Sequence, residues 1–386
     1  METFLLLASI FMFSLVTGWI FEKFKIPWLF APLIFGVILN EIGISSSEIA
    51  SLGSLGMYFM LFLVGFELDL EKIRKTSHII INTTLAIQIL STTAWTLILL
   101  ALGYPFIVAL IVGLTAHCVG EAVLVPILDE FKLLKSKIGT AIIGIGTLDD
   151  VFEVAALLLA GSLITSQRVS VENVGKAIFI LLIIAAITLV MIKVEGLKSK
   201  IMRVPKVEEL LLIGLTTLFV FTALGSMANA EGIGAILAGI AIRNLVPNKE
   251  LEKAEFGIKS LAYSFLGPIF FAWVGMSINL NTIMIFPLLT IAFYIIPMIA
   301  KIAASWLVMF REFGKLHSLF AGIALSVRFS TELVVAQLLF THGIIDPTLF
   351  TAIVASSALA TIINPLLLVG MIREIGIRKI KSPART

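Results

Sequence analysis

The strongest constraint on the fold is a series of about thirteen apolar segments, each long enough, at about 1.5 Å per residue, to cross a hydrocarbon core of about 30 Å. They run at residues 3–22, 27–42, 50–68, 78–102, 106–128, 138–165, 173–193, 207–226, 230–246, 258–277, 283–309, 317–341 and 347–372. Of the 386 residues, 59% are hydrophobic and only 14% are charged, which is unlike an ordinary soluble domain. The sequence therefore predicts an all-helical, multi-pass membrane protein, because helices satisfy their own backbone polar groups in lipid.

Lys and Arg residues test this series of segments. If the N-terminus lies outside, alternate loops and the C-terminal tail carry all but four of the 28 basic residues. The exceptions are Arg168 and Lys176, on the opposite side, and Lys301 and Arg328, inside segments. Basic residues concentrate in cytoplasmic loops. The distribution therefore predicts thirteen helices in the cell membrane (the cytoplasmic or inner membrane), with the N-terminus outside and the C-terminus cytoplasmic.

An internal repeat is visible at two helix ends. The third segment ends FLVGFELDL (62–70) and the tenth ends AWVGMSINL (272–280). The separation of seven helices is odd, so the two copies cross the membrane in opposite directions. This predicts that helices 1–6 and 8–13 are inverted six-helix repeats joined by helix 7. The alternative is a coincidence between two apolar helix ends.

The fifth helix of each half is interrupted by polar residues. Helix 5 reads GLTAHCVGEAVLVPIL and contains Thr115, His117, Cys118, Gly120, Glu121 and Pro126. Helix 12 reads GIALSVRFSTELVVAQ and contains Ser326, Arg328, Ser330, Thr331 and Glu332. Matching interruptions in two halves point to a site near the middle of the membrane, formed by broken helices.

Helix 6 carries three acids in an otherwise apolar stretch, GTAIIGIGTLDDVFEVAALLL. A carboxylate at this depth costs about 2.5–3.5 kcal/mol, so Asp149, Asp150 and Glu153 indicate a function and not stability. Asp149 and Asp150 point about 100° apart, and Glu153 returns to their flank one turn later. One acid can therefore hold a countercharge while its neighbour faces a path to water.

The residues within the segments favour binding of a monovalent cation. Away from the segment ends, five acids face two bases: Glu121, Asp149, Asp150, Glu153 and Glu332 against Lys301 and Arg328. A surplus of negative charge attracts a cation or protons, and competition for one carboxylate couples their fluxes. Oxygen ligands from carboxylates, Thr115 and unwound carbonyls suit Na⁺, whereas one Cys with one His gives no transition-metal cage. No cofactor and no nucleic-acid partner are expected.

Several of these features together resemble a known family. They are the LDDV step of helix 6, the polar break of helix 5, Lys301 of helix 11, VRFSTELVVA of helix 12 and the FLVGFELDL ending of helix 3. They resemble the second family of monovalent cation:proton antiporters, and the similarity runs from about residue 3 to residue 372 in the same helix order.

The resemblance implies the sodium/proton antiporter fold, with broken helices 5 and 12 crossed, in a homodimer. The implied dimer domain comprises residues 1–75 (helices 1–3) and 206–281 (helices 8–10). The implied core comprises 76–170 (helices 4–6) and 282–373 (helices 11–13), with linker helix 7 in 171–205 and a cytoplasmic tail at 374–386.

The resemblance also assigns roles to residues. Asp150 is the implied carrier of Na⁺ and protons, Asp149 its companion, and Lys301 the basic partner of Asp149. Family members with two adjacent acids resemble electrogenic exchangers that move two protons per Na⁺ by alternating access of the core against the dimer domain. The chain is thus expected to be a transporter and not an enzyme.

The sequence departs from the family pattern at the predicted site. His117-Cys118 and Glu121 are unusual in the break of helix 5, and Glu153 is an extra acid. Arg328 is followed by Phe329 and Ser330, with the acid only at Glu332. These residues surround the predicted site as a supporting polar network, so they bear on ion selectivity more than on fold.

Alternatives remain for single residues and for the function. Lys301 can snorkel to an interface, Arg328 can be a structural partner of Glu121 or Glu332, and Glu153 and His117 can be satisfied buried groups. The other functions are a K⁺/H⁺ antiporter of the same fold and a non-transporting sensor or channel. An intramembrane aspartyl protease is disfavoured, because Thr147 follows Gly144-Ile145-Gly146 where that pattern needs Asp.

Overall fold

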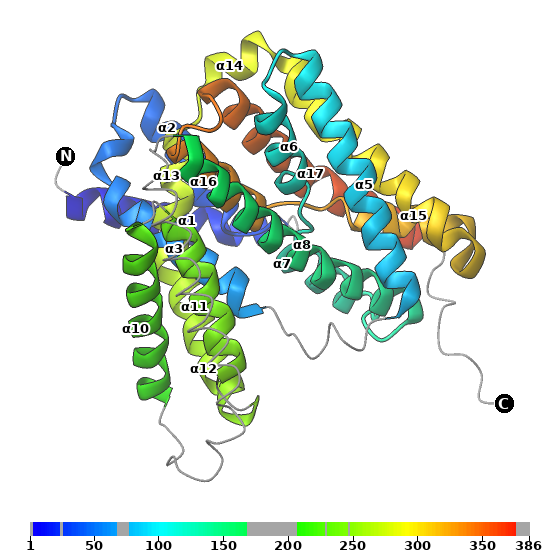
Figure 1. The fold of residues 1–386 in the computed structure, drawn as a ribbon, viewed down its shortest axis with the longest axis horizontal. Coiled ribbons are helices and arrows are strands. Elements are labelled where there is room, and N and C mark those ends of the chain that lie inside the picture. The colour runs from blue at the N-terminus through cyan, green and yellow to red at the C-terminus, as the bar shows by residue number, and fades with distance from the viewer. Residues whose placement is uncertain are drawn as a thin grey trace. The chain divides into compact units, whose positions relative to one another are not determined.

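The computed structural model describes residues 3–23, 26–67, 77–167, 207–227, 230–245 and 248–375, and this part of the chain is helical without strands (Figure 1). Seven described helices are long and apolar enough to cross a membrane, and shorter apolar helices accompany them. The prediction of an all-helical membrane protein is confirmed. Predicted helix 7 (173–193) lies outside the described residues.

The observed helices follow the predicted segments closely. The first part of the chain forms α1 (Thr3–Lys23), α2 (Phe30–Glu41), a short 3₁₀ turn (Ser46–Glu48), α3 (Ala50–Glu67), α5 (His78–Ala101), α6 (Phe106–Thr115), α7 (Glu121–Glu130) and α8 (Lys137–Gln167). The second part forms α10 (Val207–Ser226), α11 (Glu231–Leu245), α12 (Asn248–Leu261), a π-helical turn (Ala262–Leu266), α13 (Gly267–Met276), α14 (Leu280–Ile285), α15 (Pro287–Ala324), α16 (Ser330–Thr341) and α17 (Pro347–Ile375).

The segment predicted at 106–128 is two helices, α6 and α7, separated by a non-helical stretch, as the predicted interruption of helix 5 requires. The loop predicted between 309 and 317 is shortened to a turn at Gly314, which separates two helical parts of α15. Gly314 has φ +76°, which L side chains rarely adopt, so a single glycine turns the chain where a longer loop was expected.

The described residues fall into two compact units. The first comprises residues within 1–19, 28–74 and 154–277, and the second comprises residues within 20–27, 75–153 and 278–386. In the first unit α3 packs on α11, α2 on α13, and α10 on α11 and α12. In the second unit α5 lies beside α15 and α6, and α17 packs on α15 and α16 (Figure 1). The predicted division into dimer domain and core stays a prediction.

Glycine lets two helix pairs of the first unit touch through their backbones. A β-carbon at Gly65 on α3 would lie 2.0 Å from Ile236 O on α11, and one at Gly239 on α11 would lie 2.0 Å from Phe62 O on α3. Small residues allow this close approach between membrane helices.

The second close pair repeats the first. Gly36 on α2 would meet Ala272 O on α13 at 2.0 Å, and Gly275 on α13 would meet Leu33 O on α2 at 2.1 Å. Gly65 and Gly275 are the matched glycines of FLVGFELDL and AWVGMSINL. The repeat detected in the sequence thus places glycine at the same kind of helix crossing in both halves.

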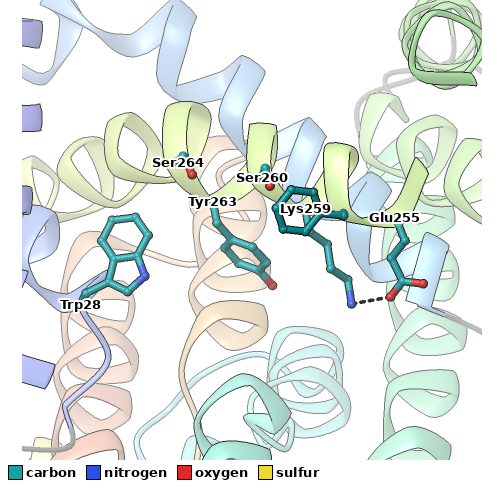
Figure 2. A pocket seen from close by; sticks show the side chains of 7 residues that line it. Trp28, Glu255, Lys259, Ser260, Tyr263 and Ser264 are labelled. Carbon is teal, nitrogen blue, oxygen red and sulfur yellow. Dashed lines mark ion pairs between the residues drawn. The ribbon is translucent and has the colours of Figure 1, made fainter. Parts of the chain in front are cut away.

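A charge network joins three helices of the first unit. Lys259 Nζ on α12 lies 3.0 Å from Glu67 Oε1 on α3 and 2.9 Å from Glu255 Oε1 on its own helix. Arg243 Nη1 on α11 lies 3.3 Å from Glu255 Oε2. Figure 2 shows the Lys259–Glu255 pair on the wall of an open groove that Trp28 and Tyr263 also line. These side chains are partly exposed, so the pairs contribute little to stability individually.

In the second unit, Tyr104 ties the α5–α6 turn to the start of α17. Tyr104 Oη donates to Asp346 Oδ2 at 2.8 Å. Asp346 Oδ1 accepts from the backbone N–H groups of Thr348 and Leu349 and so caps α17. Burial, and then the hydrogen bond to Asp346, raise the pKa of Tyr104 well above its usual range.

We expect Tyr104→Phe to lower the free energy of unfolding by about 0.5–1.5 kcal/mol, because one hydrogen bond is lost. The loss should be measurable by thermal unfolding in detergent at neutral pH. Because folding raises the pKa of Tyr104, the contribution is present at neutral pH and falls as the solution becomes strongly alkaline. Equal melting of Tyr104→Phe and the parent protein would contradict this role.

Candidate functional site

The two interrupted helices meet directly in the second unit. The break between α6 and α7 covers 116–120, and the break between α15 and α16 covers 325–329. Gly120 N donates to Val327 O at 2.7 Å, and a β-carbon at Gly120 would lie 3.3 Å from the Arg328 backbone. The predicted crossing of broken helices 5 and 12 is therefore present, and Gly120 lies at it.

Side chains from neighbouring helices satisfy the carbonyl groups that the breaks release. Such groups must find partners where water is absent. Lys301 Nζ donates to Leu325 O at 2.7 Å, and Asn364 Nδ2 donates to Ser326 O at 2.6 Å. Thr361 Oγ1 donates to Arg328 O. The break at 325–329 is thus held by α15 and α17 through three separate hydrogen bonds.

Arg328 and Glu332 form a buried ion pair at the crossing. Arg328 Nη1 lies 2.9 Å from Glu332 Oε1, and the two side chains are 2% and 1% exposed. The guanidinium also donates to Ala116 O at 3.3 Å and to Phe293 O at 3.2 Å. Ser357 donates to the second oxygen of Glu332. Arg328 therefore caps the end of α6 as well as neutralising Glu332.

Asp149 is anchored from two directions. Its Oδ1 accepts from Gln88 Nε2 of α5 at 2.8 Å, and its Oδ2 accepts from Val119 N in the first break at 3.0 Å. The side chain is 1% exposed. Lys301 is fully buried on α15, and its hydrogen bond goes to Leu325 O. The pairing of Lys301 with Asp149 stays a prediction.

Asp150, the next residue of α8, is only half-buried. The 100° step between consecutive helical residues gives the two acids different surroundings. One carboxylate is held by fixed donors, and its neighbour is more accessible.

The remaining predicted residues lie around these acids. Thr115 Oγ1 donates to Ile111 O at 2.8 Å, and Cys118 Sγ donates to Thr115 O at 3.0 Å. Glu153 lies beside the Cys118 thiol and is 2% exposed. Within the described part of the chain, the carboxylate oxygens of Glu153 and both ring nitrogens of His117 lack a hydrogen-bond partner of good geometry. Glu121 begins α7, but its side chain lies outside the described residues.

Sequence reasoning missed several groups that build the site. Gln88 and Asn364 are amides within apolar helices, and their polarity was a signal that went unused. Val119 N and Leu325 O are backbone groups, so the residue type at these positions does not predict their hydrogen bonds. Their roles depend on which helices pack together, which the chain order alone does not specify.

Comparison with known proteins agrees with this fold. The family described as sodium/hydrogen exchanger, transmembrane, matches residues 11–373. A probable Na⁺/H⁺ antiporter 3 of Methanocaldococcus jannaschii is 24% identical over 99% of this chain and 98% of its own length. The Na⁺/H⁺-K⁺ antiporter GerN of Bacillus cereus is 26% identical over 94% of this chain and 95% of its own.

A solved structure shares the fold. The sodium proton antiporter MjNhaP1 from M. jannaschii, at pH 8, superposes with a TM-score of 0.66 at 16% identity, covering 96% of this chain and 100% of that chain. The predicted antiporter fold is thereby confirmed. With its family match, its helical architecture and its crossed broken helices, this chain belongs to the transmembrane sodium/hydrogen exchangers, a family of transporters and not of enzymes.

Proposed function

We propose that this chain is a secondary active transporter that exchanges Na⁺, or Li⁺, for protons, with Asp150 as the shared carrier. One observation carries the proposal above all: adjacent carboxylates on α8 lie by the crossing, Asp149 anchored and Asp150 half-buried. A half-buried acid near the middle of the membrane can bind a proton or a hard cation in turn. Exchange follows when a bound proton and a bound cation exclude each other from the same carboxylate.

The other residues of the site have supporting roles in this proposal. Thr115 and the second lone pairs of the released carbonyls offer neutral oxygen ligands, which suit an alkali cation. Asp149 and Lys301 supply the companion acid and base, and Glu153 is a further proton-binding group. His117, Cys118, Glu121 and the Arg328–Glu332 pair keep the crossing intact around them. Na⁺ is cargo here, and no resident cofactor is proposed.

Alternating access is proposed to move the core, residues 76–170 and 282–373, against the dimer domain of a homodimer. The N-terminus would lie outside the cell membrane and the C-terminus in the cytoplasm. The basic residues of alternate loops support this orientation. The exchanger would contribute to pH homeostasis by coupling proton entry to Na⁺ export.

Two other functions differ in what crosses the membrane. GerN is named for both Na⁺ and K⁺, which favours K⁺/H⁺ exchange as the second candidate. A sensor or channel on the same frame would show no coupled flux. In proteoliposomes with a pH-sensitive dye inside, we expect Na⁺ or Li⁺ gradients to drive proton movement. No response to Na⁺, Li⁺ or K⁺ would remove the proposal.

We expect the exchange to be electrogenic, at two protons per Na⁺, as the adjacent acids suggest. One net charge per cycle is then worth about 2.3 kcal/mol per 100 mV. An imposed potential of about 100 mV should therefore shift the Na⁺ gradient at which net flux reverses by about fiftyfold. Liposomes clamped with K⁺ and valinomycin measure this shift, provided that K⁺ is not itself transported. A reversal point indifferent to voltage would indicate one-for-one exchange.

A further inference from the structure

The groove of Figure 2 combines charged, hydroxyl and aromatic side chains at one end of a membrane helix. It has a volume of about 610 Å³ and is lined by residues of the first unit: Trp28, Glu255, Phe256, Lys259, Ser260, Tyr263 and Ser264. All but Trp28 lie at the start of the apolar span Glu255–Met276. Trp and Tyr concentrate where a membrane protein meets the lipid headgroups, and Lys is common there. The groove therefore has the composition of that region.

The local backbone gathers these side chains on one side of the helix. Glu255, Lys259 and Tyr263 recur every fourth residue and form a row along α12 and the π-helical turn that follows it (Figure 2). Trp28, just before α2, lies beside the end of this row. A β-carbon at Gly18 of α1 would lie 3.1 Å from Trp28 Cβ, so α1 holds Trp28 closely. Single π-helical turns are rare and occur often at functional sites.

The charges beside the groove balance one another. Lys259 Nζ lies 2.9 Å from Glu255 Oε1 and 3.0 Å from Glu67 Oε1. Arg243 Nη1 lies 3.3 Å from Glu255 Oε2. In this network of described residues, two bases meet two acids. An anionic headgroup would add an uncompensated charge, whereas a headgroup with one phosphate and one ammonium preserves the balance.

Apolar surface lies next to the polar row. Phe256 lines the groove and is 78% exposed, and Phe265 of the π-helical turn is 46% exposed. The Phe265 ring stacks on Phe11 of α1, with ring centroids 5.9 Å apart. A soluble ion would leave these rings uncovered, whereas the acyl chains of a lipid would cover them. The groove thus suits an amphiphile better than a small polar ligand.

We propose that this groove binds one phospholipid whose headgroup carries a phosphate and a primary ammonium, of the phosphatidylethanolamine type. The phosphate would accept hydrogen bonds from Lys259 and Ser260, and the ammonium would donate to Glu255 and lie against the Trp28 ring. A carboxylate only accepts hydrogen bonds, so it distinguishes a primary ammonium from a quaternary one, which has no N–H group. This inference goes beyond the exchange function and does not depend on it.

The test is thermal unfolding of the full chain in detergent micelles that contain phosphatidylethanolamine, phosphatidylcholine or phosphatidylglycerol. A ligand that binds only the folded protein raises the melting temperature, so the response to lipid mole fraction gives an apparent affinity. We expect phosphatidylethanolamine to bind about tenfold more tightly than phosphatidylcholine, the effect of one hydrogen bond to a charged group. Phosphatidylglycerol should bind most weakly. Glycerophosphoethanolamine, the same headgroup without acyl chains, should not compete at equal concentration.

Three variants test which side chains recognise the headgroup. Glu255→Gln should lower the affinity for phosphatidylethanolamine about tenfold and raise that for phosphatidylglycerol, because one negative charge is lost. Glu67→Gln is the matched control: it removes the same charge from Lys259, but Glu67 does not line the groove. Its preference for phosphatidylethanolamine over phosphatidylcholine should remain. Trp28→Leu removes one wall and should weaken the binding of both lipids about threefold.

The outcomes decide between this site and its alternatives. Equal affinity of the parent for the three lipids overturns the proposal, and so does a Glu255→Gln variant that still prefers phosphatidylethanolamine to phosphatidylcholine. Tightest binding of phosphatidylglycerol would mark an anionic-lipid site instead, and competition by glycerophosphoethanolamine a site for a soluble ligand. If Glu255→Gln does not fold, unchanged affinities in Trp28→Leu overturn the site. Since every readout is binding, a parent without Na⁺ exchange would overturn the proposed function and leave this test intact.

Discussion

Replacing Asp150 with Asn should reduce Na⁺/H⁺ exchange to the level of protein-free liposomes. The amide has nearly the shape of the carboxyl but takes up no proton in this pH range and carries no charge to attract Na⁺. Since both cargoes are proposed to share this one group, neither half of the cycle would have a carrier. Dye-detected proton flux driven by a Na⁺ gradient measures the loss.

The matched control is the same substitution one residue earlier. Asp149→Asn keeps an acceptor for Gln88 or Val119 and leaves Asp150 in place. We expect this variant to retain exchange and to lose its response to voltage, because the resemblance associates electrogenic exchange with two adjacent acids and only one would remain. Normal Na⁺-driven proton movement in Asp150→Asn would end the assignment of Asp150 as carrier.

Removing the buried guanidinium should be the most damaging change to the fold. In Arg328→Met, Glu332 keeps a buried carboxylate without its countercharge, and Ala116 O and Phe293 O lose a donor. Breaking one side of such a pair costs about 3–5 kcal/mol. We expect little folded protein in detergent and a strongly lowered melting temperature.

A double variant tests the physical cause. Arg328→Met combined with Glu332→Gln removes both charges, so most of the electrostatic cost should disappear. The two carbonyls would still lack their donor, and a smaller loss of stability should remain. If the single variant folded and melted as the parent does, the pair would not hold the crossing together.

The features that could be predicted from the sequence are those marked by a single residue type in unusual surroundings, such as a charged side chain in an apolar segment. The acids of α8 and the polar interruptions of α6–α7 and α15–α16 stand out against apolar surroundings, and the structure has breaks at both places. The match between FLVGFELDL and AWVGMSINL also predicted a repeat. In the structure, its two matched glycines, Gly65 and Gly275, each lie where the backbone of a neighbouring helix approaches closely. The assignment of ion-binding roles stays a prediction.

The rest depends on tertiary contacts that single residues do not reveal. Gln88 becomes informative only when α5 is known to pack near α8, and Val119 acts through its backbone. The turn at Gly314 is shorter than the predicted loop at 309–317, because one glycine with positive φ is enough to redirect the chain. The order of the helices can be predicted from the sequence, but the hydrogen bonds between them depend on which helices pack together.

The hydrogen bonds that hold the second break have a mechanical consequence. Leu325 O, Ser326 O and Arg328 O are each bound to a side chain of α15 or α17, and Val327 O is bound to the first break. Moving α15, α17 or either break relative to the others would leave several buried polar atoms without hydrogen-bond partners. If alternating access moves this region, we expect the second break and the helices bound to it to move together as one rigid body, with deformation only at its boundaries.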